Sequence, residues 1–400
     1  MNVTSSMTRE ESSDTLQPAT TYHPYYKSMV ERQVVAALVG IVAVIGFCGN
    51  SLVILAVVLS RKLRTFTNVF VVNLALADLS TCTCLPWIAI AIVSEDGWEL
   101  PDWICTVNGF WIIVCLGSSI NTLACIAINR YVLITKKPST YSGLYTPWKI
   151  AVMVTITWTL PILISIVPLV SEVGEFGNNH QFSTCTWDSQ APGADLFALI
   201  VAIAYYPIQL LTIIFCYLSI YLHIRKHVKK MKASMELSSI SANISHTPQQ
   251  SETTSPQEHR QHRNKRIRRR QIDVTKNLFY IVCGFLIFIT PYVIVNVSHT
   301  DSHIFIYTAV LLLCNSCVNF FVYAAKHSDF KKVFKCIFTC NVESIPERVF
   351  CRWNEYKLMF IKDLNKSTKK NTCIPLHWQT LFRKWPMKTM VKMLTKLIII

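Results

Sequence analysis

Residues 34–60 read VVAALVGIVAVIGFCGNSLVILAVVLS, a run that contains no charged side chain. At about 1.5 Å per residue, an α-helix of ~20 apolar residues is long enough to cross the ~30 Å hydrocarbon core of a bilayer. A surface helix of a soluble protein shows instead an apolar stripe opposite a charged face. This stretch is therefore predicted to be a membrane-spanning helix.

Further apolar runs of this kind follow along the chain. Of its 400 residues, 52% are hydrophobic and 16% are charged, and the charged residues are concentrated between the apolar runs. This arrangement argues against a soluble chain, which at this length would divide into domains with polar surfaces. The seven predicted spans are 34–60, 68–94, 104–134, 148–170, 195–224, 274–298 and 303–325.

Lys and Arg residues lie in alternate connections between these spans. The connections that follow the first, third and fifth spans are basic, and the last of them ends in a run up to Arg270. The other three hold acidic residues but neither Lys nor Arg, and they cover 95–102, 171–195 and 299–302. Because cytoplasmic loops carry the excess of Lys and Arg, the N-terminus is predicted to be extracellular. The basic run is then a topology signal that also meets anionic lipid, and no nucleic-acid partner is expected.

The chain is predicted to be an all-α membrane protein with three segments. Residues 1–31 form an extracellular N-terminus in which Asn2 is a glycosylation acceptor. Residues 32–340 form a seven-transmembrane helix bundle with a short amphipathic eighth helix, and residues 341–400 form a basic cytoplasmic tail. Within the bundle, the Ser-, Thr- and Gln-rich stretch 234–255 is expected to be disordered.

The eighth helix is indicated by aromatic and aliphatic residues that recur at helical spacing over 330–338, with Lys residues between them. A basic amphipathic helix of this kind lies on the surface of a membrane and contacts its lipids. Cys336 and Cys340 at its end are candidate palmitoylation sites, with plain free thiols as the alternative.

Most of the 15 cysteines lie inside predicted spans, where Cys behaves as a small apolar residue. Cys105 and Cys185 occupy outer, oxidising positions, at the start of the third span and in the middle of the second outer loop. A disulfide bond between them would hold that loop across the mouth of the bundle. Two free thiols are the alternative.

Polar residues within the spans form an ordered set, and intramembrane polar groups are costly and usually functional. Their order and spacing over about 300 residues resemble the rhodopsin-like (class A) G-protein-coupled receptors. The stretch 126–131 is most similar to the melatonin receptors and their orphan relatives. The matching motifs are Gly49-Asn50, Asn73 to Asp78, Asn129-Arg130-Tyr131, Trp158, Phe285 with Pro291, and Asn319 to Tyr323.

The resemblance implies a sodium site around Asp78, the deepest intramembrane carboxylate. In the family this residue binds the ion together with a Ser of the third helix and polar residues of the seventh. A hard cation prefers oxygen ligands, which these side chains carry. A dry hydrogen-bonded cluster is the alternative. The residues at the matching positions are Ser119, Asn315, Ser316 and Asn319, with Asn50 behind Asp78.

The resemblance also implies that Arg130 couples the receptor to a heterotrimeric G protein. Tyr131 completes its motif, and Tyr217 and Tyr323 match the tyrosines that hold this arginine in the active state. An Arg that merely extends its head to the membrane surface is the alternative.

Four positions depart from the family pattern. Asn129 replaces the usual Asp beside the arginine, and Gln271 stands where an acidic partner is common. With less charge pairing for the inactive state, basal activity is expected. Ile289 replaces an aromatic residue, and Phe320 replaces a proline.

The ligand is predicted mainly by exclusion. Amine receptors carry an Asp at the position of Ile112, and opsins carry a Lys at that of Leu313, so neither an amine nor retinal is expected. Pro168 replaces the Asn that melatonin receptors use. An uncharged indole, a lipid or a small peptide fits better. The predicted pocket residues are Trp87, Ile112, Leu116, Tyr205, Tyr206, Tyr292 and Asn296.

Two other classes of protein are considered. An enzyme would need a metal-spaced His pair, a phosphate loop or a nucleophile with its partner, and the sequence contains none of these motifs. A seven-helix transporter or channel is the stronger alternative, but it predicts inverted repeats and helices broken near the midplane. No repeat relates the two halves of this chain.

Overall fold

A computed structural model describes residues 26, 28–94, 100–179, 182–244, 256–298 and 303–348. Seven of its helical stretches are long and apolar enough to span a membrane, so the predicted seven-helix bundle is confirmed. The helices that contribute are α1 (Met29–Leu59), α2 (Phe66–Val93), α3 (Asp102–Thr135), α5 (Pro147–Val170), α6 (Ala194–Tyr205) with α7 (Pro207–Ile244), α8 (Pro256–Val297) and α9 (Ile304–Lys326).

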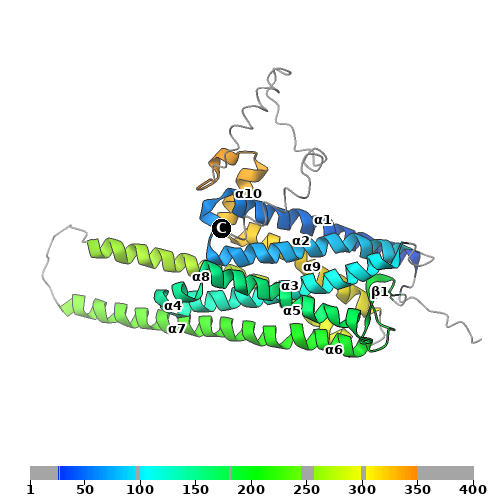
Figure 1. Cartoon of the computed structure of the whole chain (residues 1–400). Helices are drawn as coiled ribbons and strands as arrows, with labels where there is room; N and C mark the ends of the chain where they lie inside the picture. Colours follow the sequence, from blue (N-terminus) through cyan, green and yellow to red (C-terminus); the bar gives the residue numbers. More distant parts are fainter. Residues whose placement is uncertain are drawn as a thin grey trace, which may run out of the picture.

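The helices lie side by side along one long axis, and α7 and α8 project beyond the others at one end (Figure 1). Helix α3 lies among the others, and more than half of its residues are buried. Two short helices, α4 (Pro138–Leu144) and α10 (Ser328–Phe338), lie towards the projecting end, which we term the α10 end. The opposite end carries a hairpin of β1 (Glu175–Asn179) and β2 (Thr184–Asp188), and we term it the hairpin end.

The fifth span is not one continuous helix as the sequence predicts. Pro207 has no backbone N–H to donate, so the helix is interrupted at Tyr206, and α6 and α7 follow one another through this break.

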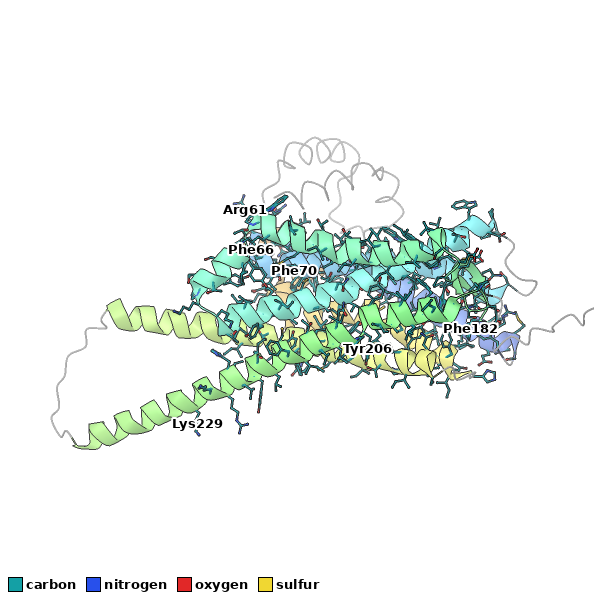
Figure 2. The ribbon with its side chains drawn as sticks, turned by 60° about the horizontal axis from the view of Figure 1, so that its bottom comes forward. Arg61, Phe66, Phe70, Phe182, Tyr206 and Lys229 are labelled. Atoms are coloured by element: carbon teal, nitrogen blue, oxygen red, sulfur yellow. A yellow bond between two sulfur atoms is a disulfide. The ribbon has the colours of Figure 1, made fainter. Side chains whose placement is uncertain are left out.

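The sequence predicts disorder over 234–255, but α7 remains helical as far as Ile244. Lys229 lies on the part of α7 that projects beyond the bundle (Figure 2). Residues 245–255 lie outside the described part of the chain.

Residues 341–348, which the sequence assigns to the tail, instead pack on the connection between α1 and α2. The Ser60 hydroxyl donates to the Pro346 carbonyl at 2.7 Å, and Ile345 is buried in the core. In the same region Lys62 pairs with Asp329 of α10 at 3.1 Å. The described chain therefore extends the membrane domain past residue 340.

The β1–β2 hairpin was not foreseen, and it packs tightly on α3. The amide of Asn108 donates to the Cys185 carbonyl at 2.7 Å, and the Thr106 hydroxyl donates to the Phe176 carbonyl at 3.2 Å. At Gly109, a Cβ atom would overlap the Thr186 carbonyl oxygen. Glycine is therefore required at this helix–hairpin contact.

We predict that Gly109→Ala lowers the thermal stability of the purified protein, because the hairpin backbone must shift to admit the methyl group. Overpacking of this kind costs about 1–3 kcal/mol. Gly40→Ala on α1 is the matched control, since no atom lies within 4 Å of the added Cβ. The control should leave the Tm unchanged or raise it. Equal Tm values for the two variants would contradict the tight contact.

Candidate functional site

Asp78 lies in the middle of the bundle and is 1% exposed. Leu74, Thr81 and Leu85 are buried on the same face of α2, because residues three or four apart in a helix share a face. This face directs the carboxylate towards α3 and α9. The Ser119 hydroxyl donates to Oδ1 at 3.1 Å, and the Asn319 amide donates to Oδ2 at 2.6 Å.

Asn50, which the resemblance places behind Asp78, hydrogen-bonds two backbone carbonyls. Its amide donates to the carbonyls of Gly46 at 2.9 Å and Ser316 at 2.8 Å. Asn50 thus holds α9 against α1, and the Ser316 side chain in turn hydrogen-bonds Asp78. The support that Asn50 gives to the carboxylate is indirect.

The chemistry of this cluster suits a monovalent cation. Two buried amide oxygens, Oδ1 of Asn319 and Oδ1 of Asn50, accept no hydrogen bond within the described residues. Together with the carboxylate of Asp78 and the two serine hydroxyls, they are the oxygen ligands that a hard cation prefers. Within the described ranges there is no group of three or more His, Cys, Asp or Glu that could hold a metal. Of the side chains named in this cluster, Asp78 is the one that can carry a negative charge.

Arg130 lies towards the α10 end of α3 and is 3% exposed. Tyr217 of α7, Tyr323 of α9 and Tyr141 of α4 lie close enough to interact with it electrostatically. The hydroxyl groups of Tyr217 and Tyr323 are buried and have no hydrogen-bond partner in the described part of the chain. By contrast, the ring of Tyr131 packs against Phe215, with centroids 5.7 Å apart.

Asn129 links three helices through its side-chain amide. Its oxygen accepts from the Thr67 hydroxyl at 2.8 Å, and its nitrogen donates to the Tyr141 hydroxyl at 3.3 Å. Tyr141 stacks on Tyr145, and burial raises the pKa of the Tyr145 hydroxyl, so that this group stays neutral. Gln271 lies in α8, and its side chain is outside the described residues.

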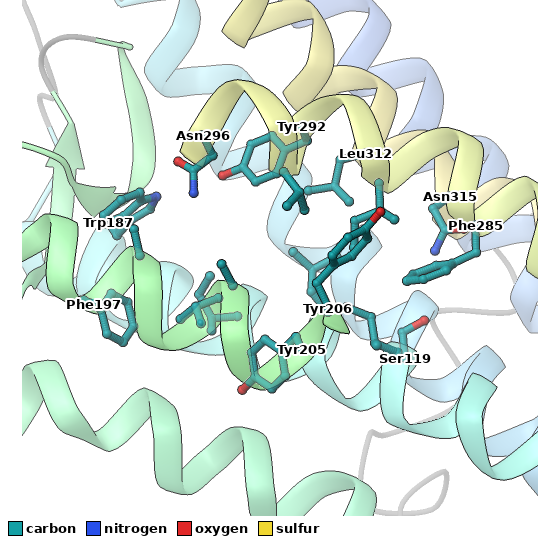
Figure 3. Close-up of a pocket in the computed structure, with 18 residues that line it drawn as sticks. Ser119, Trp187, Phe197, Tyr205, Tyr206, Phe285, Tyr292, Asn296, Leu312 and Asn315 are labelled. Carbon is teal, nitrogen blue, oxygen red and sulfur yellow. The ribbon is translucent and has the colours of Figure 1, made fainter. Parts of the chain in front are cut away.

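A cavity of about 100 Å³ lies between α3, α6, α8 and α9, closer to the hairpin end (Figure 3). The predicted pocket residues Trp87 and Ile112 do not line it: Trp87 is 37% exposed and Ile112 is buried against other helices. Ile113, one residue further along α3, takes the place of Ile112. The predicted residues that do line the cavity are Leu116, Tyr205, Tyr206, Tyr292 and Asn296.

Several lining residues were not predicted for this pocket. Trp187 reaches the cavity from the hairpin, and its position two residues after Cys185 was a usable signal. Phe285 and Ile289 line it from α8, and Ser119 and Asn315 connect it to the Asp78 cluster. None of the described lining residues is Asp, Glu, Lys, Arg or His.

The sequence predicts a disulfide, two palmitoylation sites and a glycosylation site. Cys105 and Cys185 form the predicted disulfide, with an S–S distance of 2.02 Å, and both are fully buried. Cys336 is partly buried and Cys340 is exposed at the end of α10. Asn2 lies outside the described residues.

A bundle of seven membrane-spanning helices, with a cavity at one end and a buried arginine at the other, is the architecture of a membrane receptor. The sequence profile described as "7 transmembrane receptor (rhodopsin family)" matches residues 49–323. The chain belongs to this family and is a multi-pass membrane protein, which rules out the transporter and enzyme alternatives.

Individual relatives cover the chain to different extents. It is 33% identical to melatonin receptor type 1A of Ovis aries over 178 residues, which make up 44% of this chain and 47% of that receptor. It is 28% identical to 5-hydroxytryptamine receptor 4 of Homo sapiens over 335 residues, or 78% of this chain and 81% of that receptor. The match to the sheep receptor thus spans about half of that protein.

The fold is similar to that of a solved structure described as squid rhodopsin. The TM-score is 0.66 at 20% sequence identity, covering 89% of this chain and 98% of that one. At this identity the similarity concerns the fold alone.

Because the disulfide holds the hairpin on α3, we predict that Cys105→Ala and Cys185→Ala each lower surface expression to a similar degree. The double variant should resemble either single variant, since one bond is lost in all three cases. Surface expression is measured by labelling of intact cells. Mild and additive effects would contradict a bond in the mature protein.

Proposed function

We propose that this chain is a G-protein-coupled receptor that binds an uncharged ligand in the cavity and activates a heterotrimeric G protein at its α10 end. The observation that carries this proposal is buried Arg130, flanked by two tyrosine hydroxyls that have no hydrogen-bond partner among the described residues. Tyr217 and Tyr323 lie on different helices, so a movement of these helices changes how they meet the arginine. The arginine can therefore have two arrangements with these tyrosines, and a ligand that binds one of the two conformations better shifts the equilibrium towards it.

The orientation proposed is an extracellular hairpin end and a cytoplasmic α10 end in the plasma membrane. Basic residues at the α10 end support it, among them Arg61, Lys136 and Lys335, because Lys and Arg gather on the cytoplasmic side. Glu172 and Asp188 lie in the connection that forms the hairpin. The same orientation exposes Asn2 to glycosylation and Cys336 and Cys340 to palmitoylation.

The ligand proposed is a small molecule or lipid without charge. A charged group buried without a counter-charge is strongly destabilised, and the lining offers none. Ile112 at the amine position supports the same conclusion, and Leu313 at the retinal position argues against retinal. The cavity is also small for a peptide unless the peptide inserts only one side chain.

A sodium ion at Asp78 is proposed as a second ligand of this receptor. Its support is the set of buried oxygens around the carboxylate, from Ser119, Ser316 and Asn319. When bound, sodium would neutralise the buried negative charge and hold α2, α3 and α9 together. Because the ion would bind more tightly when these oxygens converge, it would favour that conformation of the receptor.

We predict basal G-protein activation that Asn129→Asp lowers and Arg130→Ala abolishes. A carboxylate beside Arg130 adds charge pairing to the inactive state. Asn129 carries no charge, and its side chain hydrogen-bonds Thr67 and Tyr141. If the active state lies ~1–2 kcal/mol above the inactive one, its resting population is roughly 3–15%. Nucleotide exchange on G protein is measured at matched surface expression.

Asn129→Ala is the control without added charge: it removes both hydrogen bonds, whereas an Asp at this position still accepts from the Thr67 hydroxyl. Basal signal that Asn129→Asp leaves unchanged or raises would show that the neutral residue does not set the balance. Full coupling in Arg130→Ala would contradict the proposed function.

A further inference from the structure

We propose that the deep end of the cavity is a hydrogen-bonding subsite formed by Asn315 and Ser119, and that the ligand is a neutral, elongated molecule with a polar group at each end. This inference rests on the proposed function, because it assumes that the cavity is the ligand site. It adds the chemical class of the ligand and the residues that select it.

The deep end offers one amide and one hydroxyl. Asn315 is 4% exposed, and its side chain lines the cavity. Its amide therefore presents both a donor and an acceptor to the cavity. Ser119 uses its hydrogen on Asp78, so its oxygen remains an acceptor. Burying an amide without a partner is costly, and a ligand group that hydrogen-bonds it removes this cost.

The mouth of the cavity offers a second polar group. The Trp187 indole of the hairpin and the Tyr292 hydroxyl of α8 both line the cavity here. Asn296 lies one turn further along α8, where Figure 3 shows it beside Tyr292 and Trp187. In the same view Asn315 and Phe285 lie at the other end of the lining. The polar groups of the cavity are thus separated into two sets.

The wall between the two ends is apolar. Asn296 and Phe285 are 11 residues apart on α8, which corresponds to about 16 Å of helix. An apolar chain spanning this distance fills the middle of the cavity, and hydrogen-bonding groups at its ends meet the two polar sets. The six apolar side chains that define the middle are Ile113, Leu116, Val201, Ile289, Val293 and Leu312.

Ile289 controls access to the deep end, because it lies one helical turn from Phe285 on the same face of α8. Its aliphatic side chain leaves the lining continuous as far as Ser119 and Asn315. A larger aromatic side chain at this position would fill the passage. Residue 289 therefore determines whether a ligand reaches the subsite.

The test uses matched linear probes on the purified full-length receptor. Decane-1,10-diol has a hydroxyl at each end, and decan-1-ol lacks one of them. Ligands that bind the folded state raise the Tm in proportion to their affinity. We expect the diol to bind about tenfold more tightly than the alcohol, the ratio that one well-formed hydrogen bond supplies.

Variants at Asn315 and Ile289 distinguish binding at the subsite from nonspecific partitioning of the probes. Asn315→Leu removes the polar group at similar volume, so the diol and the alcohol should bind equally. Asn315→Ala should also abolish the difference and serves if the first variant folds poorly. Ile289→Trp should abolish stabilisation by both probes. Ile287→Trp is its matched control, because Ile287 is 65% exposed on the same helix and should behave as wild type.

Three outcomes would overturn the proposal. They are equal stabilisation of the wild type by both probes, a diol preference that survives in both Asn315 variants, and the absence of any stabilisation of the wild type. None of these outcomes depends on a G protein. The coupling result at Arg130 can therefore stand if the subsite fails, and the subsite can stand if coupling fails.

Discussion

The carboxylate of Asp78 is almost completely buried, and neighbouring side chains hydrogen-bond it. A buried ionised group is tolerated only when other groups hydrogen-bond or pair with it. Ser119 and Asn319 supply those bonds from α3 and α9, and Asn50 fixes α9 to α1 through the Ser316 carbonyl. A shift of any of these helices would break a buried bond, so the polar cluster constrains the register of the bundle.

The sequence predicts the spans and the disulfide because both depend on local patterns: uncharged length and the position of cysteines relative to the membrane. Which residue faces the cavity depends on about 100° of helix rotation per residue, so Ile112 was predicted where Ile113 lines the wall. The hydrogen-bond partners of Asn50 could not be predicted either, because its amide donates to backbone carbonyls that no motif encodes. The hairpin has no apolar alternation strong enough to reveal it.

The departures from the family pattern have local explanations. Phe320 lies where a proline is usual, and a Cβ at Gly49 would come within 2.7 Å of its ring. The ring also contacts Phe334 of α10, with centroids 5.5 Å apart, so the aromatic residue connects α1, α9 and α10. Ile289, likewise, leaves a passage from the cavity to the polar cluster. Ser119 then belongs to both sites, and ligand and cation binding should affect each other reciprocally.

The sodium dependence of the thermal stability tests this account most directly. The purified receptor is compared in sodium chloride and in choline chloride at equal ionic strength, alongside Asp78→Asn, which keeps the shape of the side chain but not its charge. The account predicts a higher Tm in sodium for the wild type, because a ligand of the folded state stabilises it, and no difference between the salts for the variant. An identical response of the two proteins, or none in the wild type, would contradict a cation site at Asp78.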